Sequence, residues 1–365
     1  MRLSAERIAR IVAWNKSALD WDELLRLGEH HGVLPLAARS LSAHALGIPL
    51  QTARSLQTAF DVNLRRNLWF ASELARIADY FEKNHLSAIP YKGPVLAESA
   101  YGDVALRNFG DLDWLISRAD FGPARQCLAD LGYRPSSQLT GPVERFWLRY
   151  GYERSFDSAA GKYLVELQWA LLPHFYSVDL RGDDLLARSR PASMGGREVR
   201  GLSAEDSLLV LCLHAAKHLW MRLIWVCDIA ETLRTQTVDW TILSARAREL
   251  GILRITGASL WLAQRLLGSP LPEPAQTMIA NDPEVPVLGA EFVARLARSA
   301  TYDFTSTEYF RLIWRLRERR RDRARYLWRL LWTPGEGDLA ALRLPEALFP
   351  FYRGVRAIRL LRKIF

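Results

Sequence analysis

The chain has 365 residues, 49% of them hydrophobic and 24% charged, with a formal net charge of +9, which is typical of a globular protein that buries a sizeable core. It contains no apolar run of the roughly 18 residues that a transmembrane helix needs, and its first residues lack the apolar segment of a secretion signal. Its three cysteines are widely separated, which excludes a close-spaced cysteine metal site and fits a reducing, cytoplasmic environment.

Four regions with different patterns follow one another along the chain. The N-terminal region has helical periodicity, with a long amphipathic helix predicted over residues 51–81. After a core of mixed pattern, residues 188–202 are rich in Pro, Gly, Ser and Arg and are predicted to be a connector. Ser203 then caps a helix that is predicted to continue to about Arg234. We divide the chain into an N-terminal helical region, a core, a C-terminal helical domain and a basic aromatic tail, over residues 1–83, 84–187, 203–332 and 333–365.

The core region alternates short β-like runs with helical patterns. Strands are predicted over residues 86–92, 111–116, 153–157 and 162–169, and helices over residues 93–101 and 119–131. The last two strands are separated by a turn signal and predict a hairpin. The predicted fold class is therefore α+β, with a small mixed sheet flanked by helical N- and C-terminal regions.

Asp111 and Asp113 are two carboxylates separated by one residue in the strand predicted over residues 111–116. Side chains at positions i and i+2 of a strand point to the same face, so these carboxylates converge. A divalent cation relieves their repulsion, and Mg²⁺ prefers oxygen ligands while leaving positions open for phosphate oxygens. The pair alone also fits a solvated turn that carries two acids, so its surroundings decide between the two interpretations.

A segment suited to phosphate binding precedes the pair. Gly93 lies where a strand ends and a helix begins, and a glycine there lets phosphate oxygens approach backbone N–H groups at the helix N-terminus. Lys92 is next to it, and Arg107 lies four residues before Asp111. A strand, a glycine, a helix and then Asp-x-Asp on the next strand form the layout of the DNA polymerase β-like nucleotidyltransferase fold.

With these features the chain resembles a largely uncharacterised nucleotidyltransferase family of bacteria that is part of this superfamily. It is also similar to the toxin-type nucleotidyltransferases of abortive-infection systems, which carry a comparable Lys-Gly, Arg and Asp-x-Asp series. The resemblance covers roughly residues 84–234. It rests on Tyr91-Lys92-Gly93-Pro94-Val95-Leu96, on Tyr101 and Arg107, on Gly110-Asp111-Leu112-Asp113-Trp114-Leu115-Ile116, and on residues 163–169 and 214–228.

The resemblance implies a set of site residues and a metal. Asp111 and Asp113 match the metal-binding pair, Glu166 matches the third acid on a neighbouring strand, and Gly93 matches the glycine that phosphate approaches. The implied ion is Mg²⁺, with Mn²⁺ as an alternative. Glu166 also attracts attention without the resemblance, because an acid among apolar neighbours needs a cation or hydrogen-bond partners; the alternative is an outward-facing glutamate on an edge strand.

Two positions depart from the pattern of the family. Pro94 follows Gly93 where a serine is usual, so neither a hydroxyl nor a backbone donor is present there. Lys92 is expected to compensate. Gln168 stands where relatives often have histidine, which leaves the role of that position open.

A second cluster of polar residues lies on the helix that begins near Ser203. His214, Lys217 and His218 share one stripe of that helix. The resemblance favours contact of Lys217, with His214, to the triphosphate or the acceptor. The alternative is that the two histidines are satisfied core groups that hold the helix to the sheet, whereas a lysine among apolar residues is costly unless it is paired.

A basic helix is predicted over residues 309–332. Nine arginines against two acids lie between Arg311 and Leu330, with tryptophans interleaved. The run from Arg311 to Arg329 fits an RNA- or phosphate-binding surface, an acidic partner, or an anionic lipid surface. The alternative is a solvated helix whose stripe of Leu316, Ala324 and Leu327 packs on the body of the protein.

The sequence leads to three hypotheses about function. The first is a Mg²⁺-dependent enzyme that moves an NMP from an NTP to an acceptor hydroxyl and releases pyrophosphate; the acceptor is a protein, a peptide, a small molecule or RNA. The second is a non-catalytic protein of the same fold that binds a nucleotide or a partner, which Pro94 supports. The third is an RNA-binding protein that uses the basic helix.

Overall fold

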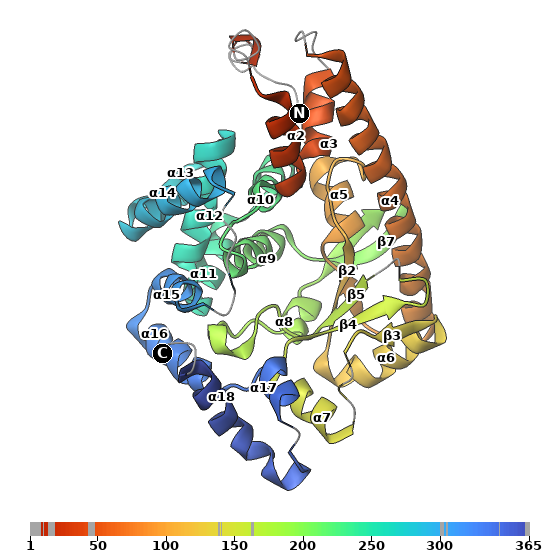
Figure 1. Cartoon of the computed structure of the whole chain (residues 1–365), viewed down its shortest axis with the longest axis vertical. Coiled ribbons are helices and arrows are strands. Elements are labelled where there is room, and N and C mark those ends of the chain that lie inside the picture. The colour runs from red at the N-terminus through yellow and green to blue at the C-terminus, as the bar shows by residue number, and fades with distance from the viewer. Residues whose placement is uncertain are drawn as a thin grey trace.

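The computed structural model describes residues 9, 11–13, 19–42, 48–137, 139, 141–161, 164–299, 303, 306–342 and 344–361. In Figure 1 the long helix α4 (Leu50–Lys83) runs along one side of a five-stranded sheet, and helices from the C-terminal half of the chain occupy the other side. The fold is therefore α+β, with a mixed sheet flanked by helices from both ends of the chain, as the sequence predicts.

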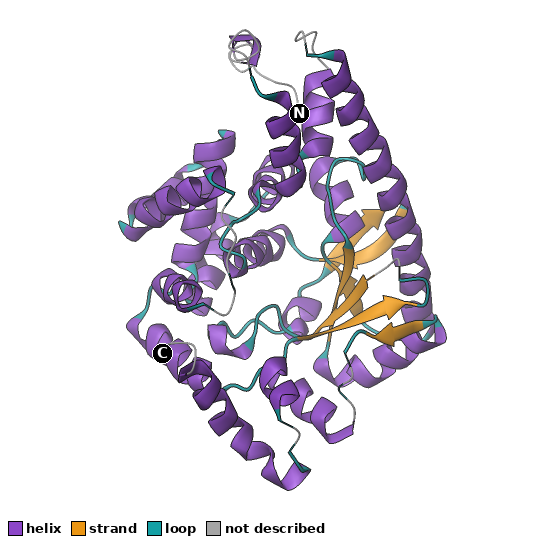
Figure 2. Ribbon diagram, viewed as in Figure 1, coloured by secondary structure: helices purple, strands orange, loops and turns teal. Residues whose placement is uncertain are grey.

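Helices dominate the described structure, and Figure 2 shows the strands gathered in one part of it. None of the helices described is both long and apolar enough to cross a membrane. Besides α4, the α-helices are α2 (Trp21–His30), α3 (Leu34–Ser42), α5 (Gly93–Tyr101), α6 (Phe121–Asp130), α7 (Gly141–Tyr150), α8 (Gly182–Ala187), α9 (Ala204–Lys217), α10 (Leu223–Thr235), α11 (Trp240–Leu250), α12 (Leu253–Leu267), α13 (Glu273–Ala280), α14 (Glu284–Ala297), α15 (Thr307–Leu316), α16 (Arg320–Trp332), α17 (Glu336–Ala341) and α18 (Tyr352–Leu361). Short 3-10 helices are η1 (Arg118–Asp120), η2 (His174–Tyr176) and η3 (Glu346–Phe351).

The main sheet has the strand order β1-β2-β5-β4-β3. Its strands are β1 (Ala88–Pro90), β2 (Asp111–Ile116), β3 (Tyr133–Pro135), β4 (Glu153–Ser158) and β5 (Leu164–Gln168). Only β2 and β5 pair in parallel, and the other neighbours are antiparallel. The predicted strand over residues 111–116 and the hairpin of β4 and β5 are confirmed, although Lys162 and Tyr163 of the predicted second arm lie outside the described residues.

The two faces of the sheet pack against different parts of the chain. Leu112, Trp114 and Ile116 of β2 are at most 2% exposed and join a core cluster with residues of α4 and α6. Leu115 belongs instead to the cluster that includes α9, α10 and α12. Because side chains of a strand alternate between faces, Asp111 and Asp113 share the face of Leu115, toward the C-terminal helices.

Residues 188–202 form an ordered hairpin, so the predicted connector is wrong. Strands β6 (Arg190–Met194) and β7 (Arg197–Gly201) pair antiparallel. Gly195 and Gly196, with φ of 59° and 77°, form the two-residue turn between them, which is the backbone that a Gly-Gly pair favours. The Glu98 carboxylate of α5 accepts a hydrogen bond from the Gly195 N–H at 2.6 Å, which ties the hairpin to α5.

The helix predicted from Ser203 to Arg234 is interrupted. Ser203 caps it as predicted, because its side chain accepts a hydrogen bond from the backbone N–H of Asp206. The helix ends at Lys217, because Leu219 and Trp220 both adopt a positive φ of 49°. The side chains of these two residues are at most 1% exposed. This turn allows α10 to fold back against α9.

The basic helix predicted over residues 309–332 is also divided, into α15 and α16. Arg317, at the break, is fully buried and donates hydrogen bonds to the carbonyl oxygens of Ser177 and Leu250 at 3.2 and 3.3 Å. Leu316 is buried as expected, but Ala324 and Leu327 are exposed. The predicted packing stripe is therefore wrong for α16, because the break at Arg317 changes which side of the helix faces the body.

A buried ion pair fixes the loop that leads into β2. Arg107 donates from Nε and Nη2 to the two carboxylate oxygens of Asp228 in α10, at 2.8 and 2.9 Å. The Tyr101 hydroxyl donates to the same carboxylate at 2.6 Å. From the other side, the Asn67 side chain of α4 donates to the carbonyl oxygens of Val104 and Arg107. The loop before Asp111 is thus held by both α4 and α10.

We predict that Asp228→Asn destabilises the protein strongly, because it leaves the Arg107 charge buried without its counter-ion. The expected loss is about 3–5 kcal/mol of unfolding free energy, measured by urea denaturation followed by circular dichroism. Arg145→Ala, which removes an exposed pair with Glu346, is the control and should change stability by less than about 1 kcal/mol. Equal effects of the two variants would contradict the assigned role of the buried pair.

Candidate metal and nucleotide site

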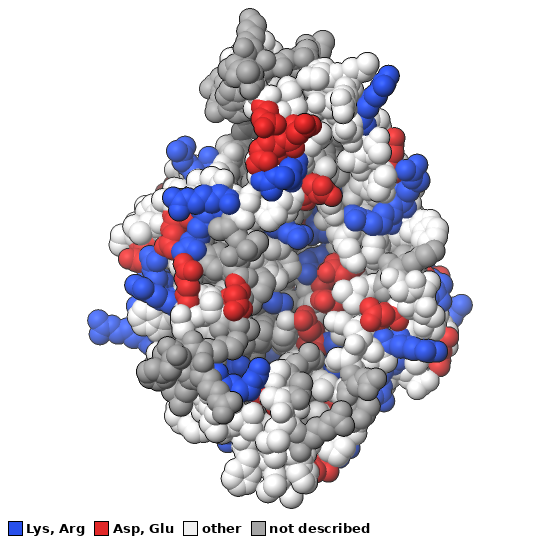
Figure 3. Space-filling model, in the orientation of Figure 1, with Lys and Arg blue, Asp and Glu red and all other residues white. Residues whose placement is uncertain are grey.

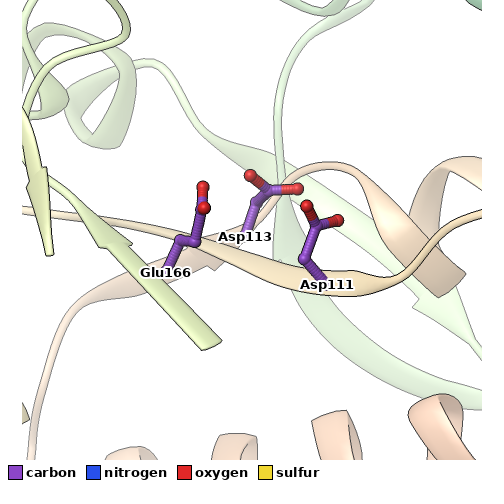
Figure 4. Close-up of side chains that lie close together, drawn as sticks. All are labelled: Asp111, Asp113 and Glu166. Atoms are coloured by element: carbon purple, nitrogen blue, oxygen red, sulfur yellow. The ribbon is translucent and has the colours of Figure 1, made fainter. Parts of the chain in front are cut away.

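Three carboxylates converge on the face of the sheet that the C-terminal helices cover. Asp111 and Asp113 extend from β2 and Glu166 extends from β5, all toward the same side (Figure 4). One oxygen of each lies within 4.8 Å of the others. The parallel register explains this geometry, because it places Glu166 directly beside Asp113. A cluster of three oxygen donors this close is suited to a divalent cation.

The electrostatics of the cluster also favour a cation. Burial is the largest influence on the pKa of Asp113; Lys92 lowers that pKa, Asp111 and Glu166 raise it, and the net result is a pKa of about 7. Burial, and then the charge of Glu153, raise the pKa of Glu166 to about 7. Both carboxylates are thus costly to ionise in the absence of a cation, since like charges share a site of low dielectric.

The hydrogen bonds of Asp113 leave one of its oxygens available. Its Oδ1 atom is 2.8 Å from Nζ of Lys92 and accepts a hydrogen bond from Nε2 of Gln168 at 3.0 Å. Its Oδ2 atom is buried and has no hydrogen-bond partner within the part of the chain that the structure describes. A buried carboxylate oxygen without a donor is costly, and a bound cation would remove that cost. The residues present therefore fit a divalent metal ion.

Gln168 connects the two strands that carry the acids. Its side-chain Nε2 donates both to Asp113 Oδ1 and to Glu166 Oε2, at 3.0 and 2.9 Å. Its Oε1 accepts a hydrogen bond from the buried Tyr91 hydroxyl at 2.5 Å. The sequence left the role of Gln168 open. In the structure its side-chain amide holds the carboxylates of Asp113 and Glu166 in their relative positions.

Lys92 and Gly93 lie next to the carboxylates, at the start of α5. Lys92 is only 7% exposed, and although burial opposes its charge, Asp113, Asp111 and Glu166 together raise its pKa. Gly93 has a φ of 55°, and a Cβ atom there would lie 3.3 Å from the backbone oxygen of Asp111. The glycine therefore allows α5 to begin against β2. Pro94 occupies the first turn of α5, where its missing N–H does not weaken the helix.

A cavity of about 460 Å³ opens over this cluster and is also lined by polar residues of α9. Figure 3 shows charged side chains of both signs along the hollow between the sheet and the C-terminal helices. Lys217 lines the cavity; its Nζ donates to the Tyr152 hydroxyl at 2.9 Å and lies 4.6 Å from the centre of the Tyr152 ring. His214 and His218 line it as well, one helical turn apart with ring centres 4.9 Å apart.

The two histidines are neutral in this environment. Burial, together with the charges of Lys92 and Lys217, lowers the pKa of His214 well below its usual value and that of His218 to about 3. Nζ of Lys92 is 3.5 Å from Nδ1 of His214. Because an ammonium group only donates, this geometry assigns the ring proton to Nε2. His214 can therefore offer a neutral N–H to a ligand, but not a positive charge.

The remaining predicted site residue, Arg107, does not line this cavity. Its guanidinium group uses two nitrogen atoms for Asp228, as described above. The structure thus brings together Lys92, Gly93, His214 and Lys217 with the three acids, and it places Arg107 behind them. The position of Arg107, four residues before Asp111 in the sequence, did not reveal that its side chain lies behind the acids. Spacing alone does not indicate the direction in which the loop between the two residues turns.

Several residues of the cavity could not be found from the sequence, and three of them contact the predicted site. Tyr152 immediately precedes β4, Glu153 begins it, and Tyr309 comes from α15. Glu153 lies on the same face of the sheet as the three acids. It is opposite Gln168 of β5, and Ser155, two residues further along β4, is opposite Glu166. The alternation of side chains between the two faces of β4 could be predicted from the sequence, but the register of β4 against β5 could not. Tyr309 donates to the backbone oxygen of Lys217 at 2.8 Å, a contact without a local sequence signal.

A comparison with protein families decides the membership of the chain. Residues 17–268 match the family described as uncharacterised nucleotidyltransferase. The chain belongs to this nucleotidyltransferase family. The matched residues include β1–β5, α5 and α9, and therefore all three carboxylates, Lys92 and Lys217. Tyr309 lies outside the match. Searches among curated proteins and among solved structures found no match.

Membership of the nucleotidyltransferase family supports nucleotidyl transfer as the general chemistry. It also supports an NTP as substrate and a divalent metal as cofactor. The cluster of Asp111, Asp113 and Glu166 is an acidic group of the kind that holds such a metal.

We predict that Gln168→Leu weakens metal binding, because the two carboxylates lose the amide that holds them in position. The expected fall in Mn²⁺ affinity is about 10–100-fold, measured by isothermal titration calorimetry. Gln57→Leu, on the exposed surface of α4, is the matched control and should leave the affinity unchanged. An unchanged affinity in Gln168→Leu would contradict the positioning role of the amide.

Proposed function

We propose that this nucleotidyltransferase moves an NMP from an NTP to an acceptor hydroxyl, with Asp111, Asp113 and Glu166 as ligands of Mg²⁺ or Mn²⁺. The observation that supports this most directly is the cluster of three converging carboxylates, in which a buried oxygen of Asp113 has no donor among the described residues. In the reaction the acceptor oxygen forms a bond to the α-phosphorus, the bond to pyrophosphate breaks, and the hydroxyl proton leaves.

The bound metal would stabilise charge on the phosphates and lower the pKa of the acceptor hydroxyl. The other residues of the cavity supply what the metal does not. Lys92 brings an ammonium group to the triphosphate, Lys217 brings one to the triphosphate or the acceptor, and His214 brings a neutral N–H. Gly93 allows α5 to begin against the strand of Asp111, and the dipole at the N-terminus of this helix favours negative charge. Tyr91 and Gln168 keep the acids in place.

The strand order suggests the side from which the acceptor enters. Lys92 and Gly93 follow β1, the acids lie on β2 and β5, and Glu153 lies on β4, so these groups follow one another across the sheet. Glu153 also borders a second cavity of about 320 Å³ together with Ser136, Ser137 and Ser155. Its Oε2 atom is buried and has no hydrogen-bond partner among the described residues. We infer that the phosphates lie toward β1 and that Glu153 accepts a hydrogen bond from the acceptor on the β4 side.

Pro94 supports a second candidate, a protein that binds a nucleotide without transferring it. The proline removes one backbone donor from the N-terminus of α5, next to Gly93. Calorimetry with each NTP and Mg²⁺, combined with a mass-spectrometric search for NMP-modified products in host lysate, separates the two candidates. Binding without any product would favour the non-catalytic candidate.

The double variant Asp111→Asn with Asp113→Asn tests the metal assignment. We expect it to abolish Mg²⁺-dependent NMP transfer and Mn²⁺ binding, because an amide neither carries the charge nor replaces the second carboxylate oxygen as a ligand. Transfer is followed by mass spectrometry, binding by calorimetry and folding by circular dichroism. Asp22→Asn with Asp157→Asn, two exposed aspartates, is the matched control. Transfer that survives in the double variant would sink the assignment.

Glu153→Gln tests the acceptor side. We expect nucleotide binding with Mg²⁺ to remain, while transfer to the acceptor falls by about tenfold or more because a charged hydrogen bond is lost. Calorimetry measures the first quantity and product formation the second. A variant that loses nucleotide affinity instead would place Glu153 on the phosphate side and overturn the proposed direction.

A further inference from the structure

The outer face of α16 is apolar where a solvated helix would be polar. Tyr326 and Leu330 point into the protein and are at most 8% exposed. The opposite face carries four large apolar side chains in its last two turns. These are Leu327, Trp328, Leu331 and Trp332, which are 48%, 64%, 46% and 41% exposed. Helix faces of this kind mark a site of interaction.

Positive charge accompanies this face. Arg320, Arg321 and Arg325 lie on the exposed side in the first two turns of α16. The side chain of Arg321 is 69% exposed, and that of Arg325 is 43% exposed. Asp322, the acid within α16, is only 3% exposed. Asp179 is an exposed acid near this face, and its carboxylate pairs with Arg325 and Arg329. The face therefore presents a net positive charge beside its apolar side chains.

The neighbouring C-terminal elements also expose apolar side chains. Helix α18 packs along α16, and Nε of Arg356 donates to the backbone oxygen of Leu330 at 3.2 Å. Phe351 and Ile358, from η3 and α18, are 66% and 55% exposed. In Figure 3 the lower end of the molecule, over α17 and α18, shows mostly uncharged side chains. Exposed apolar groups thus continue beyond α16 itself.

We propose that the outer face of α16 binds the surface of an anionic lipid bilayer and holds the protein there as a peripheral protein. Trp328 and Trp332 enter the interface between headgroups and acyl chains, where the amphipathic indole ring is favoured. Leu327 and Leu331 enter beside them, and Arg320 and Arg321 contact the anionic headgroups. The charge of this face is complementary to such a surface, and the binding strength grows with the apolar area inserted.

Two features favour lipid over RNA and over a protein partner. RNA binding uses aromatic side chains as platforms for bases, but Trp328 and Trp332 lie against each other with ring centres 5.5 Å apart. The exposed side chains of Leu327 and Leu331 beside them match hydrocarbon rather than bases. Arg320 and Arg321 beside exposed tryptophans and leucines match an anionic bilayer, which offers headgroups to the charges and acyl chains to the apolar side chains. This inference is independent of the proposed transfer reaction.

Vesicle sedimentation with the full chain tests the proposal. The probes are vesicles of phosphatidylcholine alone and of phosphatidylcholine with phosphatidylglycerol. We expect binding to the anionic vesicles only, and about tenfold weaker binding for Trp328→Ser. Arg320→Gln with Arg321→Gln should weaken binding as well and reduce its sensitivity to salt. Trp69→Ser is the matched control, since Trp69 of α4 is 54% exposed outside this face, and it should bind like the unmodified protein.

Several results would overturn the proposal. One is the absence of sedimentation with anionic vesicles, and another is equal loss of binding in Trp328→Ser and Trp69→Ser. Retention of a single-stranded RNA that requires Trp328, without lipid binding, would assign the face to RNA. Analytical ultracentrifugation that shows a dimer dissociated by Trp328→Ser, again without lipid binding, would assign the face to a second copy of this chain. Circular dichroism confirms that each variant is folded.

Discussion

The repulsion among three clustered carboxylates is the constraint on which the rest of this structure depends. Asp113 is buried and Asp111 and Glu166 are half-buried, and one oxygen of each lies within 4.8 Å of the others. Like charges this close, and partly removed from water, are costly unless a cation compensates them. Lys92 provides part of the compensation through its contact with Asp113. A divalent ion would compensate the remaining negative charge and would in turn attract the phosphates of a nucleotide. In the proposed function, metal binding and nucleotide binding therefore originate in the same electrostatic cost.

The fold is arranged to keep these charges together despite the repulsion. The parallel pairing of β2 with β5 sets Glu166 beside Asp113, and the Gln168 amide links their side chains. Behind the site, the pair of Arg107 and Asp228 anchors the loop before β2 to α10. Arg107, which the sequence suggested for phosphate binding, holds the loop before β2 in position through this buried pair, and its role toward phosphate stays a prediction.

The C-terminal part of the chain contributes in two separate ways. Through α15 it adds Tyr309 to the cavity and supports the backbone of Lys217, although this helix lies outside the residues matched to the nucleotidyltransferase family. Through α16 it presents arginines and tryptophans to the outside. The break at Arg317 separates these roles, since burial of that side chain turns the second helix away from the first. A wall of the candidate-site cavity and a candidate membrane surface are therefore close in sequence but face different surroundings.

The sequence by itself determined the elements with a strong local period and the groups that such a period orders. The long helix α4, the strand Asp111–Ile116 and the shared face of Asp111 and Asp113 follow from spacing along one segment, and Gly93 marked the start of α5 through the special backbone that glycine allows. The hairpin of β6 and β7 was readable from Gly195-Gly196 but was overshadowed by its Pro- and Gly-rich surroundings. The sequence predicted the pairing of β4 with β5, but only the tertiary structure decided the other strand neighbours and the register. The register in turn places Glu153 on the face of the acids and lets Gln168 link Asp113 to Glu166. The tertiary structure also decided that Arg107 turns to Asp228 and that Leu327 faces outward. These outcomes depend on contacts between residues far apart in the chain, and local periodicity carries no information about them.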